Sequence, residues 1–305
     1  MQLIFNDNFK KYFNLNLYIT KNNMEIVTKI APIALALIML GLGLGLTTKD
    51  FTRILQNPKD FIIGLICQLI ILPTIAYILI LVFGTPLELA LGVMIIAAAP
   101  GGVTSNVMTK FANGDVALSI SLTAVVSLIS IISVPFIVLK SADLLNIPII
   151  SKEISMTGVA LKMAGVVSVP VILGMIIRNF SENFISSNIK IIEKITGILF
   201  LIVFAAIWIE ERENILSYLS QAGIVVLTLN MTMMLIAYFI AKKFASGIQQ
   251  RKCIAIECGL QNGTLAVFVA TLIFDDIVYM VPTAAYALIM YITAFIFMYI
   301  VRKSN

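Results

Sequence analysis

The stretch AAAPGGVTSNVMTKFANGD, residues 97–115, interrupts a long apolar run with a proline, two glycines and polar side chains. Pro100 removes a backbone hydrogen-bond donor, and Gly101 and Gly102 carry no side chain, so a continuous helix is disfavoured there. A proline kink between closely packed helices would explain this stretch taken alone. The interpretation changes because a second interruption of the same kind occurs later in the chain.

The second interruption is IAIECGLQNGTLAVF, residues 254–268, where Glu257, Gln261 and Asn262 break an apolar run. The two interruptions lie five predicted spans apart, so the chain crosses the membrane in opposite directions at them. This pattern is typical of inverted repeats with two crossed discontinuous helices. Lipid cannot satisfy the freed backbone groups, so they must be buried in protein or face water. We therefore expect a midplane site for ions and a polar substrate.

Composition indicates an integral membrane protein. Of the 305 residues, 60% are hydrophobic and 12% are charged, with a mean hydropathy of +1.03. Soluble domains carry about twice that share of charge, so a soluble enzyme and a nucleic-acid binder are excluded. The net charge of +5 fits Lys and Arg retained on the cytoplasmic side of a bilayer. The fold class is thus all-α, embedded in lipid.

The apolar segments predict about nine transmembrane helices of roughly 20 residues each. They cover residues 27–46, 61–83, 87–109, 115–138, 157–178, 191–210, 221–241, 252–273 and 280–301. Lys and Arg fall mostly in the connections that a cytoplasmic C-terminus would place inside. We therefore expect a multi-pass protein of the inner or plasma membrane with its C-terminus in the cytoplasm. Residues 1–26 form a polar tail without the apolar core of a secretory signal.

Two residue counts narrow the kinds of metal site and catalytic site that the chain can form. The chain has no His, which excludes His-based metal sites and Ser-His-Asp triads. Its three cysteines, Cys67, Cys253 and Cys258, lie in or beside apolar runs and form no CxxC motif. They are expected to be small buried hydrophobic residues.

Glu257 is predicted to be the only acidic residue deep within a span. An ionisable group at the bilayer centre costs at least about 2.5–3.5 kcal/mol, so a partner or a function must compensate. A bound cation is the first interpretation. A protonated Glu257 within the core, or an ion pair with Lys162, are the alternatives.

Other oxygen ligands follow from spacing. Ser119 and Thr123 are four residues apart and share one helix face. Gln68 is an isolated amide in the apolar run CQLIILP. Such residues often bond only to their own helix or join neighbouring helices. Together with Glu257 they supply hard oxygen ligands and one negative charge, which suits a sodium ion.

The motifs PGGVTSNVMTKFANGDVALSISLT (100–123) and ECGLQNG (257–263), with Gln68 and Pro73 in support, resemble those of the bile acid:sodium symporter family, in particular its bacterial members. The resemblance covers the chain from about residue 30. It implies a transporter domain over residues 27–305, with a core (about 61–138 and 221–301) beside a panel (about 27–46 and 157–210). One helix of the ten usual in bacterial members is missing at the N-terminus. Val103-Thr104 departs from the usual pair, which suggests a different substrate.

The resemblance also implies two sodium sites behind the crossover. The first would use Ser105, Asn106, Ser119, Thr123 and Glu257. The second would use Gln68, Glu257 and Gln261 with the carbonyls of Cys258 and Leu260. Asn262, Gly102, Val103 and Thr104 would face the substrate, although Asn262 has a helix-capping alternative.

The function predicted is sodium-coupled symport of a small organic anion by alternating access. A proton-coupled carrier or channel using Glu257 is the alternative. An intramembrane enzyme, with Glu257 or Asp275-Asp276 as catalytic carboxylates, is a weaker one. Substrate identity and oligomeric state lie beyond the sequence.

Overall fold

The computed structural model describes residues 31–56, 58–147, 155–210, 215–274 and 276–302, so the predicted N-terminal tail lies outside it. All regular secondary structure in this part of the chain is helical. The helices are Ala31–Gly45, α2 Thr48–Gln56, α3 Pro58–Ile66, η1 Cys67–Ile71, α4 Leu72–Phe83, α5 Leu87–Ala98, α6 Val103–Phe111, α7 Val116–Leu144, α8 Met156–Met163, η2 Ala164–Ser168, α9 Val169–Phe180, α10 Glu182–Glu210, α11 Ile215–Phe244, α12 Ile248–Gly259, α13 Gly263–Ile273, η3 Ile277–Met280 and α14 Val281–Arg302.

Five helices in the described residues are long and apolar enough to cross a membrane. A sixth is added if Ala31–Gly45 and Thr48–Leu55, bent by 70°, count as one span. The shorter apolar helices Leu87–Ala98 and Gly263–Ile273 are halves of the two spans that the sequence predicts to be interrupted. The full number of nine crossings stays a prediction.

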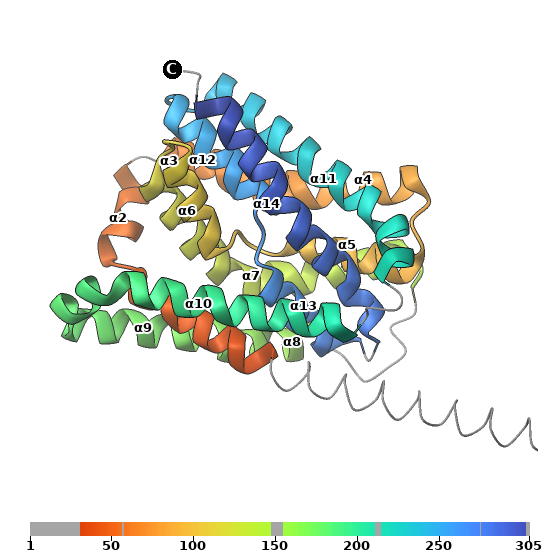
Figure 1. Cartoon of the computed structure of the whole chain (residues 1–305), viewed down its shortest axis with the longest axis horizontal. Coiled ribbons are helices and arrows are strands. Elements are labelled where there is room, and N and C mark those ends of the chain that lie inside the picture. Colours follow the sequence, from red (N-terminus) through yellow and green to blue (C-terminus); the bar gives the residue numbers. More distant parts are fainter. Residues whose placement is uncertain (1–30, 57, 148–154, 211–214, 275, 303–305) are drawn as a thin grey trace, which may run out of the picture.

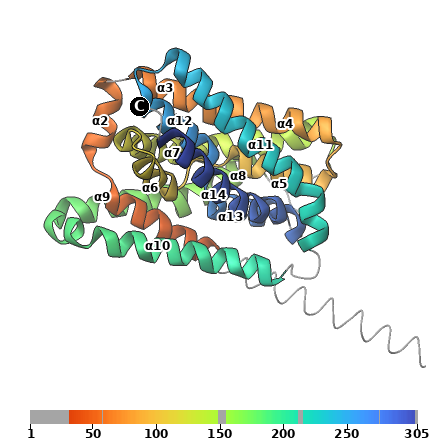
Figure 2. The same cartoon turned by 45° about the horizontal axis from the view of Figure 1, so that its top comes forward.

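The helix Ala31–Gly45, α9 and α10 lie together on one side of the remaining helices (Figures 1 and 2). Glycines allow this close approach. A Cβ on Gly174 would stand 2.5 Å from the Leu40 carbonyl oxygen, and one on Gly43 would collide with the Val171 carbonyl. Small residues at helix contacts are typical of packing in lipid. The division of the helices into a panel and a core stays a prediction.

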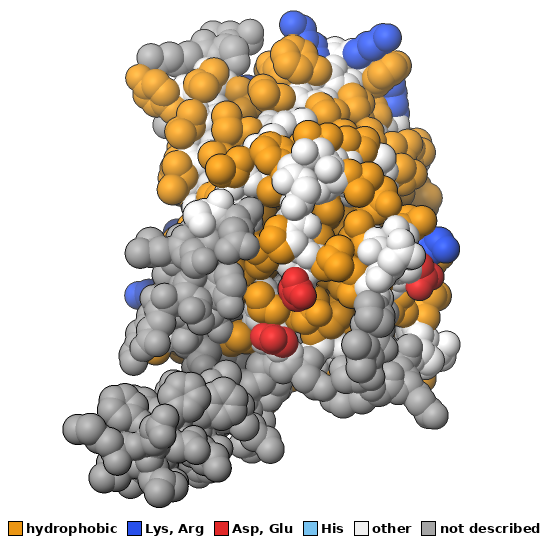
Figure 3. Space-filling model, turned by 90° about the vertical axis from the view of Figure 1, so that its right-hand side faces the viewer, with side chains coloured by type: hydrophobic (Ala, Val, Ile, Leu, Met, Phe, Trp, Pro, Cys, Tyr) orange, Lys and Arg blue, Asp and Glu red, His pale blue; other side chains and the backbone are white. Residues whose placement is uncertain are grey.

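The centre of the other group is formed by α5 and α12. Every residue of α5 from Leu89 to Ala98 is buried, and so is every residue of α12 from Lys252 to Gly259. A helix that is apolar on all faces belongs inside a bundle, as α5 does. Hydrophobic side chains cover most of the described surface in Figure 3, as expected of a surface that faces lipid.

Both predicted interruptions are present, and they meet. The chain is non-helical between α5 and α6 and between α12 and α13. The Asn262 N–H donates to the Pro100 carbonyl at 2.8 Å, and the Gly102 N–H donates to the Leu260 carbonyl at 3.3 Å. An antiparallel bridge thus joins Gly101 to Gln261, so the two broken helices cross in opposite directions and satisfy each other's backbone.

The short helix α2 was not predicted from the sequence. Asp50 accepts hydrogen bonds from the backbone N–H and the hydroxyl of Thr47, both at 2.7 Å, which fixes its first turn. Arg53 then forms a salt bridge with Asp115, the N-cap of α7, at 3.0 Å. This helix therefore ties the chain after Gly45 to the start of α7.

Candidate functional site

The carboxylate of Glu257 is fully buried at the crossover and surrounded by hydroxyl groups. Ser105 and Ser119 donate short hydrogen bonds to its Oε1. Thr123 Oγ1 lies 3.1 Å from Oε2. Ser105 belongs to α6, whereas Ser119 and Thr123 share one face of α7, as their spacing predicts.

This cluster contains too few hydroxyl protons for its oxygens. Ser105 Oγ also lies 2.6 Å from the Gly102 carbonyl oxygen. Ser119 and Thr123 also lie 2.8 Å and 3.3 Å from Asn106 Oδ1. Each hydroxyl carries one proton, so once all three donate to the carboxylate none remains for Asn106 Oδ1, whereas the Gly102 carbonyl still accepts from the Ser105 N–H at 3.0 Å. A group of oxygen atoms with too few hydrogen-bond donors is a favourable environment for a cation.

Two amide side chains, Gln68 and Gln261, contact the backbone at the end of α12 that carries Glu257. Gln68 Nε2 donates to the Glu257 carbonyl at 2.9 Å, and Gln261 Nε2 donates to the Cys258 carbonyl at 2.9 Å. Because carbonyls accept only, each amide must turn its nitrogen toward them. Gln68 Oε1 and Gln261 Oε1 are consequently buried without a hydrogen-bond partner among the described residues. Unpaired buried oxygens are rare and costly, and a bound cation would satisfy them.

The last carbonyl of α12 has two donors that sequence reasoning missed. Asn230 Nδ2 of α11 and Tyr286 OH of α14 donate to the Gly259 carbonyl at 2.7 Å and 3.1 Å. Thr293 donates to Asn230 Oδ1. A helix end leaves its last carbonyls without helical partners. Side chains from two neighbouring helices therefore fix the turn that carries the ion-facing residues.

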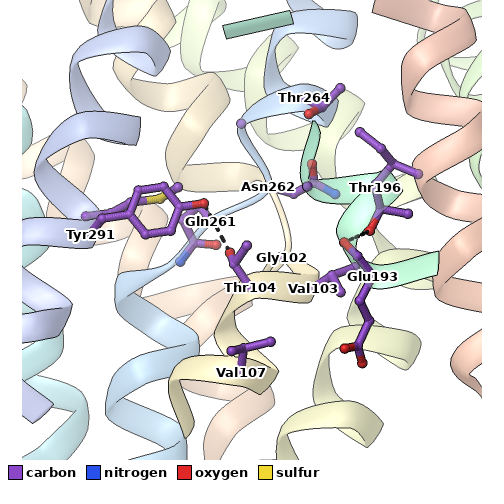
Figure 4. Close-up of a pocket in the computed structure, with 14 residues that line it drawn as sticks. Gly102, Val103, Thr104, Val107, Glu193, Thr196, Gln261, Asn262, Thr264 and Tyr291 are labelled. Carbon is purple, nitrogen blue, oxygen red and sulfur yellow. Dashed lines mark hydrogen bonds between the residues drawn. The ribbon is translucent and has the colours of Figure 1, made fainter. Parts of the chain in front are cut away.

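A cavity of about 90 Å³ opens at the crossover, between α10 and the first turns of α6 and α13 (Figure 4). Its lining includes Gly102, Val103, Thr104, Val107, Gln261, Asn262, Gly263, Thr264 and Tyr291, with Ile38, Glu193 and Thr196 opposite. Tyr291 OH lies 3.4 Å from Thr104 Oγ1. The cavity is several times larger than a single water needs, so it has room for a small polar group.

Two helix N-termini face this cavity. No side chain caps α6 at Gly102, so the N–H groups of Val103 and Thr104 lack a capping partner. Asn262 Oδ1 caps α13 by accepting from the Leu265 N–H at 3.0 Å, so its alternative role as a capping residue is confirmed. Helix N-termini carry partial positive charge and free N–H donors, which favour an anion.

The structure brings Glu257 together with Ser105, Ser119, Thr123, Gln68 and Gln261, as predicted. Leu260 offers a carbonyl that already accepts from Gly102. The alternative of an ion pair between Glu257 and Lys162 is wrong, because Lys162 is exposed and Glu257 pairs with no cation among the described residues. Asp275 lies outside the described residues, and exposed Asp276 caps η3 through the Val278 N–H.

The expectation that Glu257 is the only acid deep within a span stays a prediction, and the exposed Glu193, which lines the cavity from α10, was not predicted. Its sequence neighbours Lys190 and Lys194 made it resemble a solvated helix end. Tyr291 was also missed, because nothing local separates it from other aromatic residues of α14. No local sequence signal could have identified either residue.

The family model described as Sodium Bile acid symporter family matches residues 32–218. An uncharacterized sodium-dependent transporter, YocS of Bacillus subtilis, is 29% identical over 268 residues, which cover 86% of this chain and 79% of that protein.

Two further relatives come from eukaryotes. A probable chloroplastic sodium/metabolite cotransporter, BASS2 of Oryza sativa subsp. japonica, is 28% identical over 84% of this chain and 60% of its own length. The ileal sodium/bile acid cotransporter of Oryctolagus cuniculus is 25% identical over 83% of this chain and 73% of its own length. Similarity of this kind covers both interruptions only where the alignment spans most of the chain.

Proposed function

The chain belongs to the sodium bile acid symporter family, and from this premise we propose that it is a sodium-coupled symporter of a small organic anion. The observation that carries the proposal is the buried Glu257 carboxylate, which three hydroxyls contact, together with two unpartnered amide oxygens on Gln68 and Gln261, whose nitrogens bond the carbonyls of Glu257 and Cys258. The chain would work as a multi-pass membrane protein with its C-terminus in the cytoplasm.

Two sodium ions would bind behind the crossover. Ser105, Asn106, Ser119, Thr123 and Glu257 would hold the first, where hydroxyl protons are too few for the acceptors. Gln68 Oε1, Gln261 Oε1 and the Glu257 carboxylate would hold the second, with the Cys258 and Leu260 carbonyls beside it. Sodium accepts this mixture of neutral oxygens and one carboxylate, as hard cations generally do.

The anion would bind on the opposite face of the crossover, in the cavity. The backbone N–H groups of Val103, Thr104 and the first turn of α13 are directed at its negative group. The Asn262 amide nitrogen is free to donate, because its oxygen serves the cap. Gly102 leaves room for the solute beside the junction.

The crossover couples the two faces. Glu257 would contribute to both ion sites. Gln261 lines the cavity, and its Oε1 would contact the second sodium ion. Sodium bound behind the crossover would fix the turn between α12 and α13 and so raise the affinity for the anion. By linkage, the anion must raise sodium affinity by the same factor.

A proton-coupled carrier is the rival function, in which Glu257 takes up one proton. A proton would relieve the shortage around the hydroxyls, but it would leave Gln68 Oε1 and Gln261 Oε1 without partners. Sodium therefore explains more of the observed geometry.

Uptake of organic acids into proteoliposomes, driven by a sodium gradient or a potassium gradient at one fixed pH, tests the proposal. Accumulation should require sodium and be lost in Glu257→Ala. Uptake that follows a pH gradient and ignores sodium would establish the proton-coupled carrier instead.

A further inference from the structure

Glu193 places a carboxylate on the wall of the cavity that faces the crossover. It comes from α10, opposite the first turn of α6 (Figure 4). Its side chain is exposed and forms no ion pair with another described residue. Lys190 and Lys194, its basic neighbours on α10, do not line the cavity. A charge that faces a membrane cavity without a partner is a candidate for ligand binding.

The two walls of the cavity therefore differ in sign. On one wall, the N-termini of α6 and α13 present partial positive charge and free N–H groups. On the other wall, Glu193 presents a full negative charge. A solute with a negative group alone would be attracted by the first wall and repelled by the second. A solute with both charges would be attracted by both.

We propose that the transported solute is a zwitterion, whose carboxylate binds at the N-termini of α6 and α13 and whose protonated amine binds Glu193. This inference rests on the proposed sodium symport and changes its substrate class from a simple organic anion to a carboxylate that also carries an amine. In Figure 4 the Glu193 side chain extends toward Val107 and away from Asn262. The helix N-termini and Glu193 line opposite walls of the cavity, so the two charges of the solute must be separated across it.

That separation favours an amino acid whose amine is at the far end of a short carbon chain over one whose amine is next to the carboxylate. Suitable probes are 4-aminobutanoate and 5-aminopentanoate. Their matched controls are 4-hydroxybutanoate and 5-hydroxypentanoate, which keep the carboxylate and the length but lack the charge on nitrogen.

Binding of these four probes to the purified full chain in sodium can be measured by calorimetry. We expect the wild-type chain to bind each amino acid at least tenfold more tightly than its hydroxy counterpart. Glu193→Gln should reduce this ratio to below about twofold. Glu182→Gln, which removes an exposed acid from the same helix away from the cavity, should leave the ratio unchanged.

Sodium binding, followed by thermal unfolding, separates this inference from the proposed function. Equal binding of amino and hydroxy acids, or a preference that survives Glu193→Gln, would overturn the proposal that the solute is a zwitterion. Sodium stabilisation without binding of any probe would also overturn it while leaving sodium coupling intact. Loss of sodium stabilisation in the wild-type chain would instead contradict the proposed function.

Discussion

Gly101 and Gly102 are adjacent at the crossover, but only Gly101 lacks room for a side chain. A Cβ on Gly101 would collide with Glu257 Oε2 and stand 3.1 Å from Gln68 Nε2. A Cβ on Gly102 would meet nothing closer than Thr104 Oγ1, at 3.6 Å. The change Gly101→Ala should therefore displace the Glu257 carboxylate, whereas Gly102→Ala should leave it in place.

The contacts of Glu257 Oε2 set the size of the effect. Thr123 Oγ1 lies 3.1 Å from this oxygen, and Gln68 Nε2 lies 3.5 Å from it. A hydrogen bond to a charged group contributes about 1.5–3 kcal/mol. A displaced carboxylate costs the sodium ion one charged ligand contact; if this contact is worth as much as such a hydrogen bond, sodium binding becomes about 10- to 150-fold weaker, since each 1.4 kcal/mol is tenfold in affinity.

The assay is thermal unfolding of the purified chain across a series of sodium concentrations at constant ionic strength. A ligand that binds the folded state raises its stability in proportion to RT ln(1 + [L]/Kd), so weaker binding moves the response to higher sodium. Gly102→Ala is the matched control and should respond like the wild type. Wild-type sodium response in Gly101→Ala, or equal loss in both variants, would refute the geometric reasoning.

Three further outcomes are expected. Glu257→Gln keeps the shape of the side chain but removes its charge, so stabilisation by sodium should disappear in unfolding assays; a retained response would contradict the cation role. Asn230→Ala removes a donor from the last carbonyl of α12 and should lower the free energy of unfolding by about 1–3 kcal/mol in denaturant titrations. Its control, Thr228→Val, removes an exposed hydroxyl that bonds only its own helix, and an equal loss there would argue against the capping role. With the native cysteines removed, an impermeant thiol reagent outside the cell should label Glu88→Cys and not Ser181→Cys; the opposite result would invert the proposed orientation.

The sequence predicted the crossover because the signals there are local. Pro100 and the two glycines after it weaken a helix wherever they occur, and polar residues inside an apolar run need a partner. The spacing of Ser119 and Thr123 also placed both hydroxyls on one face. What the sequence did not distinguish is the role of the two glycines, since the lack of room at Gly101 depends on a carboxylate more than 150 positions away in the chain.

Other features that were not predicted from the sequence have a similar explanation in the tertiary fold. Asn230 and Tyr286 act on the Gly259 carbonyl from two other helices, and neither stands out in its own segment. Glu193 lies between lysines, a pattern typical of a helix end in water. Helix α2 is polar and short, so a search for apolar spans does not find it. Apart from α2, whose Thr47–Asp50 cap is local, each of these features depends on contacts between distant segments, which one sequence without its fold does not specify.

The hydrogen bonds that join the two broken helices come from the main chain, namely from the N–H groups of Asn262 and Gly102. The junction needs the free space at Gly101, but its hydrogen bonds make no use of the side chains on the cavity wall. Val103, Thr104 and Thr264, which line the cavity, can be exchanged in the course of evolution without breaking it. Substrate preference and the proposed sodium sites can consequently diverge at separate rates, so that one fold serves different solutes while its coupling ion stays the same.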